Sequence, residues 1–241
     1  MILAVAPLSE LLTYGNKGYL DELFWGAIST IEISIFGYAL GCSLGLLGAV
    51  GKLSGSKWTK SFLNGYTTLF RAVPELVLIL LLYYAGTDSL NKLIGLFGFN
   101  PITVNPLIAA IFVLGVVQGA YSTEVLRAAI QAVPVGQVEA AKAYGMSSLL
   151  RFRRIVLPAM LPFAIPGLAN LWLNITKDSA LVAVIGSTEL ANVTRIAAGG
   201  SKQYLVFYVI AAMIYLTISI SSNQLFAWLE RRARRGQQKL A

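Results

Sequence analysis

The segment EAAKAYGMSSLLRFRRIVLP, residues 139–158, is the most informative stretch of this 241-residue chain, because it is short and polar between long apolar runs. Three of its first residues are alanines, so a helix formed here would have small side chains and a narrow surface. Gly145 removes a further side chain. The helix breakers Pro134 and Gly136 precede it, so Glu139 stands where a helix N-terminus favours a carboxylate. We predict a short helix with a small-residue face, suited to a groove on another protein. An ordinary amphipathic surface helix is the alternative.

The rest of the chain has the composition of a polytopic membrane protein. Hydrophobic residues make up 56% of the chain and charged residues 12%, whereas soluble domains carry roughly 25% charged residues. The mean hydropathy is +0.69. There is no histidine and a single cysteine, Cys42, which excludes histidine-liganded metal sites, serine–histidine triads and an intrachain disulfide. A phosphate-binding P-loop motif is also absent, so we expect no catalytic residue, metal site or bound cofactor.

Five apolar segments are long enough to cross a bilayer, which takes roughly 20 residues of helix. They are residues 24–50, 62–86, 106–131, 160–185 and 204–228. Ionisable residues interrupt the second, third and fourth segments, whereas the last carries none. With no internal repeat, the pattern predicts an all-α membrane protein with a single domain over residues 1–241. Residues 133–158 then form the loop between the third and fourth spans.

Basic residues are unevenly divided between the two sides that five crossings create. Thirteen lysines and arginines fall on the side of the 133–158 loop and the C-terminal tail, and four fall on the other side. Basic loops stay in the cytoplasm, next to anionic lipid, so we predict a cytoplasmic C-terminus and an N-terminus outside. These loops also explain the net charge of +8 without nucleic acid as a partner. The opening residues, MILAVAPLSE, lack the basic region and cleavage site of a signal peptide.

The second apolar segment contains LFRAVPELVLIL, residues 69–80, where two charges and a proline interrupt the run. In a continuous helix, Arg71 and Glu75 would lie one turn apart on one face, and Pro74 would kink the helix by freeing the carbonyl of Phe70. Exposing a charge to lipid costs at least roughly 2.5–3.5 kcal/mol, so both side chains should face the bundle or a water-filled cavity. Either the two charges neutralise each other and fix the packing, or Glu75 faces a solute while other groups hold Arg71.

Polar side chains also follow helical spacing in the third and fourth apolar segments. The third carries Gln118, Tyr121 and Ser122 near its middle and Glu124 nearer the cytoplasmic side, and the fourth carries Asn170, Asn174, Lys177 and Asp178. Hydrogen bonding between helices explains at least part of such stripes. Together the stripes predict a polar cavity near the middle of the membrane.

The 139–158 segment resembles the coupling loop of ABC importer permeases, in which EAA is followed by three residues, Gly, nine residues and I-x-L-P. Every fixed position of that pattern is filled, by Glu139, Ala140, Ala141, Gly145, Ile155, Leu157 and Pro158. The stretches FRAVPELVLILLLYY, AYSTEVLRAAI and ITKDSALVAVIG each resemble segments of the polar amino-acid uptake permeases. The resemblance covers about residues 28–230, and it implies the type I ABC importer permease (MetI-like) architecture.

This resemblance implies an assembly in the bacterial inner membrane. Members of the family work as a pair of permease subunits with two cytosolic ATPase subunits and an extracytoplasmic binding protein. ATP and Mg²⁺ would therefore be used by the partner ATPase and not by this chain. In the histidine/arginine/opine branch two different permease subunits pair as a heterodimer, and Glu75 directly after Pro74 resembles the Q-type member. The expected solute is a polar, and more specifically a basic, amino acid or an opine.

Residue patterns and the resemblance together assign the candidate residues to three roles. The ATPase-coupling residues are Glu139, Ala140, Ala141 and Gly145, the solute-binding residues are Glu75, Gln118, Tyr121, Ser122, Asn170 and Asn174, and the structural or gating residues are Arg71, Glu124, Lys177 and Asp178. A secondary transporter or channel subunit for a small polar solute would also explain the intramembrane charges. It leaves the 139–158 pattern unexplained, and no inverted repeat supports it. An intramembrane enzyme would need a nucleophile with a base, or a metal site.

Overall fold

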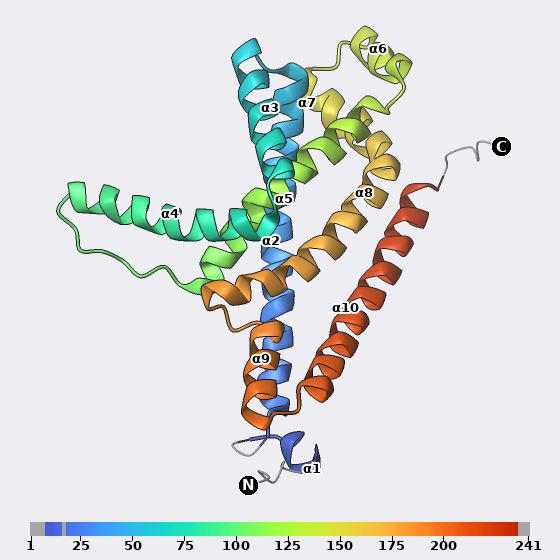
Figure 1. Ribbon diagram of the computed structural model, residues 1–241. Coiled ribbons are helices and arrows are strands. Elements are labelled where there is room, and N and C mark those ends of the chain that lie inside the picture. The colour runs from blue at the N-terminus through green and yellow to red at the C-terminus, as the bar shows by residue number, and fades with distance from the viewer. Residues whose placement is uncertain (1–7, 16–17, 236–241) are drawn as a thin grey trace.

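The computed structural model describes residues 8–15 and 18–235, and every regular element in these ranges is a helix (Figure 1). The long helices are α2 (Leu20–Ser54), α3 (Lys57–Ala72), α4 (Glu75–Leu96), α5 (Pro106–Gln131), α8 (Leu157–Asp178) and α10 (Tyr204–Ala233). The shorter elements are α1 (Leu8–Leu11), α6 (Val135–Ala143), α7 (Ser148–Arg151), a π-helical stretch (Phe152–Val156), a 3₁₀ stretch (Ser179–Ile185) and α9 (Leu190–Ser201). The predicted all-α class is confirmed for these residues.

Five helical stretches are long and apolar enough to cross a membrane. They are Leu20–Ser54, Glu75–Leu96, Pro106–Gln131, Ser148–Ile185 and Tyr204–Ala233. They follow the order of the five apolar segments, so the five-span class is confirmed within the described residues. The third stretch has the expected bounds, whereas the others are longer or shifted.

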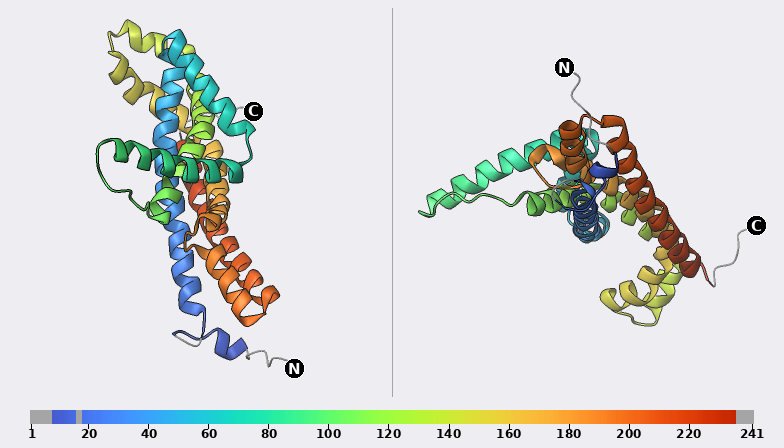
Figure 2. Two further views of the ribbon diagram at one scale, coloured as in Figure 1. Left: turned by 60° about the vertical axis from the view of Figure 1, so that its left-hand side comes forward. Right: turned by 90° about the horizontal axis from the view of Figure 1, so that it is seen from below.

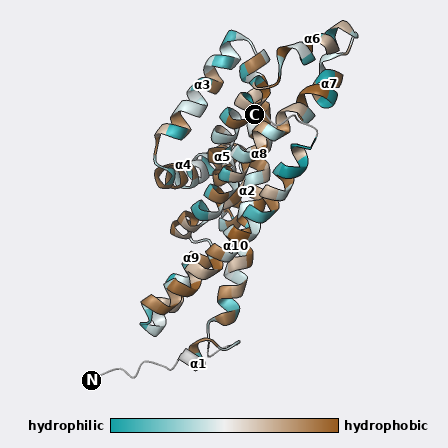
Figure 3. Ribbon diagram, turned by 90° about the vertical axis from the view of Figure 1, so that its right-hand side faces the viewer, coloured by the Kyte–Doolittle hydropathy of each residue, from teal (hydrophilic) through white to brown (hydrophobic). Residues whose placement is uncertain are grey.

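The longest helix, α2, forms the axis around which the other elements are arranged (Figures 1 and 2). The elements between residues 135 and 156 gather near one end of α2, which we call the loop end, and α1 and α9 lie near the opposite end. At the loop end α3 lies beside α2, whereas α4 runs across α2 and projects from the body in both figures. Figure 3 shows hydrophilic and hydrophobic residues mixed along α3. Hydrophilic residues of α3 thus lie at the loop end.

The second apolar segment, 62–86, is not one kinked helix, because the chain breaks between α3 and α4. Val73 and Pro74 are both extended, with ψ angles of 138° and 135°. A proline disfavours the helical conformation in the residue before it, and it lacks the N–H that would continue the hydrogen-bond ladder. Glu75 therefore opens a new helix. The expectation that Arg71 and Glu75 share one helix face is wrong.

Close packing of α2 against α5 builds the centre of the bundle. A Cβ atom at Gly41 would stand 2.8 Å from the side chain of Gln118, and one at Gly45 would stand 2.3 Å from the Cβ atom of Ser122. Both distances are well below an ordinary carbon–carbon contact. Only glycine at these positions lets the two backbones approach so closely. The glycine spacing therefore selects which polar residues of α5 are covered by α2.

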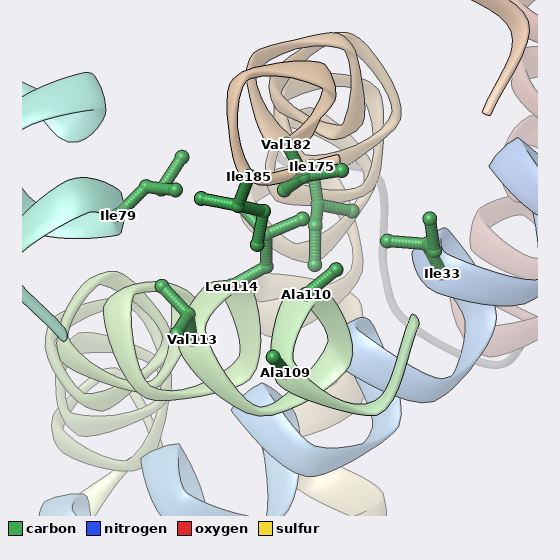
Figure 4. Packing of buried hydrophobic residues seen from close by; sticks show 9 residues of the cluster. All are labelled: Ile33, Ile79, Ala109, Ala110, Val113, Leu114, Ile175, Val182 and Ile185. Carbon is green, nitrogen blue, oxygen red and sulfur yellow. The ribbon is translucent and has the colours of Figure 1, made fainter. Parts of the chain in front are cut away.

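A hydrophobic cluster fastens α4, α5 and α8 to α2 (Figure 4). Its buried members are Ile33, Ile79, Ala109, Ala110, Val113, Leu114, Ile175, Val182 and Ile185. Leu78 and Ile79 are the buried residues of α4, so only the first turns of this helix are held by the body. The cluster consequently holds Glu75, at the start of α4, next to α5 and the end of α8.

At the opposite end of the molecule, a buried carboxylate opens α9. Glu189 is 0% exposed, and it accepts hydrogen bonds from the N–H groups of Ala191 and Asn192, both at 2.8 Å, and from the Tyr215 hydroxyl at 3.0 Å. The Thr30 hydroxyl donates to it at 3.5 Å. Burial raises the pKa of this carboxyl, against the opposing effect of its hydrogen bonds. Glu189 ties α2, α9 and α10 together, a role that no sequence pattern predicted.

Candidate functional site

Polar side chains from four helices meet near the break between α3 and α4. They are Arg71 at the end of α3, Glu75 at the start of α4, Tyr121 on α5 and Asp178 at the end of α8. The Arg71 guanidinium lies over the Tyr121 ring, 5.9 Å from its centroid. The Glu75 carboxyl lies close enough to the Tyr121 hydroxyl and the Asp178 carboxyl for electrostatic interaction with both. We call Glu75, Tyr121 and Asp178 the carboxylate cluster, and it unites candidates from three of the apolar segments.

Arg71 and Glu75 do not form the ion pair that one interpretation of the sequence expected. The ion pairs of the described residues join Lys52 and Arg127 to Glu124, Lys92 to Asp88, and Arg234 to Glu230. Because the helix breaks between them, Arg71 stacks on the Tyr121 ring while Glu75 interacts with Asp178. The Glu75 carboxyl is therefore not held by the cation of its own segment.

Two carboxylates close together are an unfavourable pair unless a proton or a cation accompanies them. Like charges a few ångströms apart repel strongly where the effective dielectric constant is low. The charge of Lys177 acts on its sequence neighbour Asp178, but Lys177 itself is exposed. The carboxylate cluster can therefore accept a further cation, because an ammonium or guanidinium group can donate hydrogen bonds to both carboxylates.

The polar stripe of α8 faces outward from the subunit. Asn170, Asn174 and Lys177 are all exposed, and their spacing places them on one helix face that leads to Asp178. Across residues 8–15 and 18–235, the amides of Asn170 and Asn174 have no hydrogen-bond partner. An amide without a partner is unfavourable against lipid, so this face needs a partner chain or water beside it. The stripe is thus available to a solute or to a second subunit.

Gln118 and Ser122 are not part of this outward surface. Gln118 is 4% exposed against Gly41, and its Nε2 donates to a backbone carbonyl of α8 at 2.9 Å. Ser122 is 0% exposed against Gly45. The expectation that both line the solute cavity is corrected here, because α2 covers their side of α5 and both serve helix packing. Of this stripe, only Tyr121 reaches the carboxylate cluster.

Glu124 holds a separate ionic network toward the loop end. Its carboxylate is 2.6 Å from Lys52 Nζ and 2.8 Å from Arg127 Nη2, and Lys52 also donates to the Thr67 hydroxyl at 2.6 Å. These contacts join α2, α3 and α5, as a structural role for Glu124 requires. Hydropathy alone misses Lys52, because it ends the first apolar segment at residue 50, whereas α2 continues to Ser54.

A polar cavity of about 400 Å³ opens beside this network. Its lining residues are Lys52, Lys60, Asn64, Thr67, Thr68, Arg71, Glu124 and Arg127, and we call it the basic cavity. Arg71 borders both this cavity and the Tyr121 ring of the carboxylate cluster. The two polar regions are therefore neighbours, with the basic cavity on the side of the loop end.

The segment with the coupling-loop pattern begins with a helix at the loop end. This helix, α6, starts at Val135 directly after Pro134, so Glu139 lies in its second turn and does not open it as expected. Glu139 and Ala140 are exposed, whereas Ala141 is buried. The exposed edge of α6 is narrow because its residues are small. That shape suits insertion into a groove of another protein.

Gly145 makes the turn that ends α6. Its φ angle is 70°, in a region that glycine adopts readily and other residues rarely do. Its N–H donates to the Lys142 carbonyl at 2.9 Å, and the N–H of Met146 donates to the Ala141 carbonyl at 3.1 Å, which closes the helix end. The chain then passes through α7 and the π-helical stretch directly into α8. The coupling segment is thus continuous with the helix that ends at Asp178.

Comparison with known proteins relates these features to one family. The family described as "Binding-protein-dependent transport system inner membrane component" matches residues 37–235. The octopine transport system permease protein OccQ of Rhizobium radiobacter is 37% identical over 232 residues, which cover 96% of this chain and 98% of the relative. The histidine/lysine/arginine/ornithine transport system permease protein HisQ of Escherichia coli (strain K12) is 38% identical over 221 residues, which cover 92% and 96%.

Solved structures share the same arrangement of helices. A crystal structure of an amino acid ABC transporter with histidines matches with a TM-score of 0.74 and 30% sequence identity, covering 89% of this chain and 95% of that chain. The inward-facing MetNI methionine ABC transporter matches with a TM-score of 0.63 over 88% and 95% of the two chains, and its 17% identity speaks for the fold alone. By its family match and by relatives that align over nearly their whole length, this chain belongs to the binding-protein-dependent inner-membrane components, the permease subunits of ABC importers.

Proposed function

We propose that this permease subunit serves solutes that carry a positive charge, namely basic amino acids or opines. The observation that carries the proposal is the meeting of Glu75, Tyr121 and Asp178 at the ends of three helices, where the two carboxyls lie within electrostatic reach of each other. A solute ammonium or guanidinium group between them would replace a repulsion with two charge-assisted hydrogen bonds. A neutral solute offers no such exchange. The names of OccQ and HisQ, which refer to octopine and to histidine, lysine, arginine and ornithine, support the same class of solute.

The stripe of α8 supplies the remaining polar contacts in this proposal. The exposed amides of Asn170 and Asn174 can donate to the carboxylate of an amino acid and accept from its ammonium group. Together with Glu75, Tyr121 and Asp178, they form the solute-facing set. Asp178 enters this set in addition to its expected structural or gating role, since it is half of the carboxyl pair.

The chain makes and breaks no covalent bond in the proposed cycle. It offers a path that opens alternately to the two sides of the membrane, whereas ATP, Mg²⁺ and hydrolysis belong to a separate ATPase subunit. Import in one direction requires that nucleotide and binding protein stabilise different conformations of the permease. The coupling segment is continuous with α8, so closure of ATPase subunits at the loop end would move Asp178 relative to Glu75.

We expect two ATPase subunits at the loop end, a second permease subunit and an extracytoplasmic binding protein. Support for a second permease subunit comes from the outward polar stripe of α8, where the exposed amides of Asn170 and Asn174 are unfavourable against lipid. The apolar side chains of α4, among them Leu81, Tyr84 and Leu93 at 58%, 58% and 56% exposed, can face either lipid or that subunit. By likeness to the Q-type relatives, we expect a different permease chain in that place.

We place the loop end in the cytoplasm of a bacterial cell and the N-terminus outside the inner membrane. The support is the excess of basic residues, thirteen against four, on the side of the 133–158 loop and the C-terminal tail. A reporter enzyme fused after Ala241 should be active in the cytoplasm. A fusion that is active only on the outer side would overturn this orientation.

The solute proposal is tested by Glu75→Gln in the assembled transporter, reconstituted in liposomes with its binding protein. We expect arginine uptake to fall about tenfold or more, because the loss of one carboxylate–cation contact removes about 1.4 kcal/mol or more of binding free energy. Assembly and stimulation of ATPase activity by the binding protein should persist. Glu230→Gln, at a partly exposed carboxylate paired with Arg234, is the matched control and should leave uptake unchanged. Unchanged arginine uptake by Glu75→Gln would refute the solute contact.

The coupling role is tested by Gly145→Leu. A leucine at a φ angle of 70° is strained although open space surrounds the Cβ position, so the turn after α6 should change shape. We expect uptake to be lost while membrane insertion is retained, and ATPase activity should no longer respond to the binding protein. Gly199→Leu is the control for the added side chain, because Gly199 has open space and no positive φ and lies in α9, away from the coupling segment. Normal transport by Gly145→Leu would count against the role.

A further inference from the structure

The polar face of α3 is not part of the carboxylate cluster. Lys60, Asn64, Thr68 and Arg71 recur every three or four residues along this helix, and all of them line the basic cavity. Among the described residues, α3, with 16 residues, is the one long helix that is not a candidate membrane span. A charged face is unfavourable against lipid. This face of α3 therefore requires water beside it.

The basic cavity has an excess of positive charge. Four of its five ionisable side chains are basic, and Glu124 is the single carboxylate. Lys52 and Arg127 already share that carboxylate, at 2.6 and 2.8 Å. Lys60 makes no ion pair in the part of the chain that the structure describes, and Arg71 stacks on an aromatic ring and not on a carboxylate. A cleft lined by charges of one sign focuses its potential and changes the local concentration of ions roughly tenfold or more.

The basic cavity and the carboxylate cluster stand in series along one route. Arg71 borders both of them, and α3 leads from Arg71 to the loop end (Figure 1). A solute that leaves the carboxylate cluster toward the loop end would pass Thr68, Asn64 and Lys60 in turn. It would thus move from a site with two carboxylates into a water-filled region of opposite charge.

We propose that the basic cavity is a positively charged exit vestibule, which lowers the local concentration of cationic solute and so opposes its return from the loop end. The inference rests on the proposed function for the charge of the solute and for the cytoplasmic placement of the loop end. Movement of solute from the carboxylate cluster into the vestibule is coupled to the conformational change that the partner ATPase drives. Return binding has no such source of energy, and its rate falls with the concentration of solute in the vestibule.

The potential of the vestibule can be measured without any solute. A reporter thiol at Thr68→Cys, in a Cys42→Ser background of the assembled transporter, is reacted with an anionic and a cationic methanethiosulfonate of similar size. We expect the rate of the anionic reagent divided by the rate of the cationic reagent to be about tenfold higher at this thiol than at a free thiol in solution. Lys60→Gln should lower that preference roughly threefold, and raised salt should lower it further. Lys57→Gln is the control, because it removes the same charge from the same helix outside the cavity.

The effect on transport is measured with liposomes loaded with increasing concentrations of arginine. In Lys60→Glu, half-inhibition of arginine uptake should need about threefold less internal arginine than in the wild type, because the vestibule then repels the cation less. Asn64→Cys is a second reporter position if Thr68→Cys does not assemble. The proposal is overturned if the ratio of anionic to cationic reagent rates equals that of a free thiol. It is also overturned if internal arginine inhibits uptake by Lys60→Glu at the same concentration as in the wild type. Failure of the wild type to import arginine would instead overturn the proposed solute, because the reagent measurement is independent of it.

Discussion

Two acidic sites in this bundle differ in how completely their own chain satisfies them. Glu189 is 0% exposed, and four donors surround it, namely two N–H groups of α9, a tyrosine hydroxyl of α10 and a threonine hydroxyl of α2. The Glu75 and Asp178 carboxyls instead lie within electrostatic reach of each other, with an exposed lysine beside Asp178. The first site has every acceptor in use. The second has acceptors in excess and a repulsion between them.

This difference separates a carboxylate that holds helices together from one that is ready to bind. A buried acid whose oxygens all accept hydrogen bonds stabilises the packing of the elements that donate to it. Its acceptor atoms are already occupied and do not need a ligand. An unsatisfied pair costs stability, and the proposed cationic solute would be the group that completes it. Burial alone would have favoured Glu189 as the functional acid. The inventory of donors favours Glu75 and Asp178.

The largest effect that tests this comparison is expected at Glu189. Glu189→Ala leaves buried N–H and hydroxyl donors without an acceptor, at about 1 kcal/mol each, so we expect the free energy of unfolding to fall by about 2–3 kcal/mol. Uptake per assembled transporter should stay the same, because the site lies at the opposite end of the bundle from the coupling segment. Thermal unfolding of the purified complex in detergent and arginine uptake in liposomes provide the two measurements.

Glu75→Ala is the matched variant for stability. It removes a carboxyl that lies close to another carboxyl, so we expect no loss of stability or a small gain. The comparison fails if Glu75→Ala destabilises the complex as much as Glu189→Ala does, since Glu75 would then be structural too.

An intermediate effect is expected at Asp178. Asp178→Asn keeps the shape of the side chain and removes one charge of the pair, so arginine uptake should fall roughly three- to tenfold, or by about 0.7–1.4 kcal/mol. Because Glu75 and Asp178 lie within electrostatic reach of each other, the double variant Glu75→Gln/Asp178→Asn should lose less than the sum of the two single effects in free energy. Strict additivity in initial rates of uptake would show that the two carboxyls do not share one cation.

The sequence predicted the parts of this structure that depend on long or complete patterns. The five apolar segments appear in order as helices, because a membrane-spanning helix needs a long run that hydropathy detects. The 139–158 pattern predicted a short helix, which α6 provides, whereas the turn at Gly145, with its positive φ, was seen only in the structure. Arg71, Glu75, Tyr121 and Asp178 were all candidates, and packing of four helices brings them together.

The incorrect predictions, for Gln118, Ser122 and the helix break at Pro74, share one physical cause. The residue spacing within one helix does not say which of its faces another helix will cover. The spacing of Gln118 and Ser122 matches that of Tyr121 on a polar stripe, yet α2 covers the first two through Gly41 and Gly45. The equal spacing of the two glycines and the two polar residues was the available signal. The break at Pro74 was taken as a kink because a proline permits either outcome, and tertiary packing decides between them.

The smallest predicted effect is a dependence of stability on pH at Glu189. Burial raises the pKa of this carboxyl above its ordinary value of 4.5, so the folded protein keeps the proton at a pH where the unfolded chain has released it. The stabilisation is therefore complete below the unfolded pKa and is lost as pH rises through the folded pKa. Glu189→Gln cannot titrate, so the stability of the wild type relative to this variant should fall by about 1 kcal/mol as pH rises from about 4 to 7. Unfolding midpoints of both proteins across that range measure the difference. A difference that grows with pH would mean that the four donors stabilise the ionised carboxylate by more than burial destabilises it, and Glu189 would then be a stronger tie among α2, α9 and α10 than its burial implies.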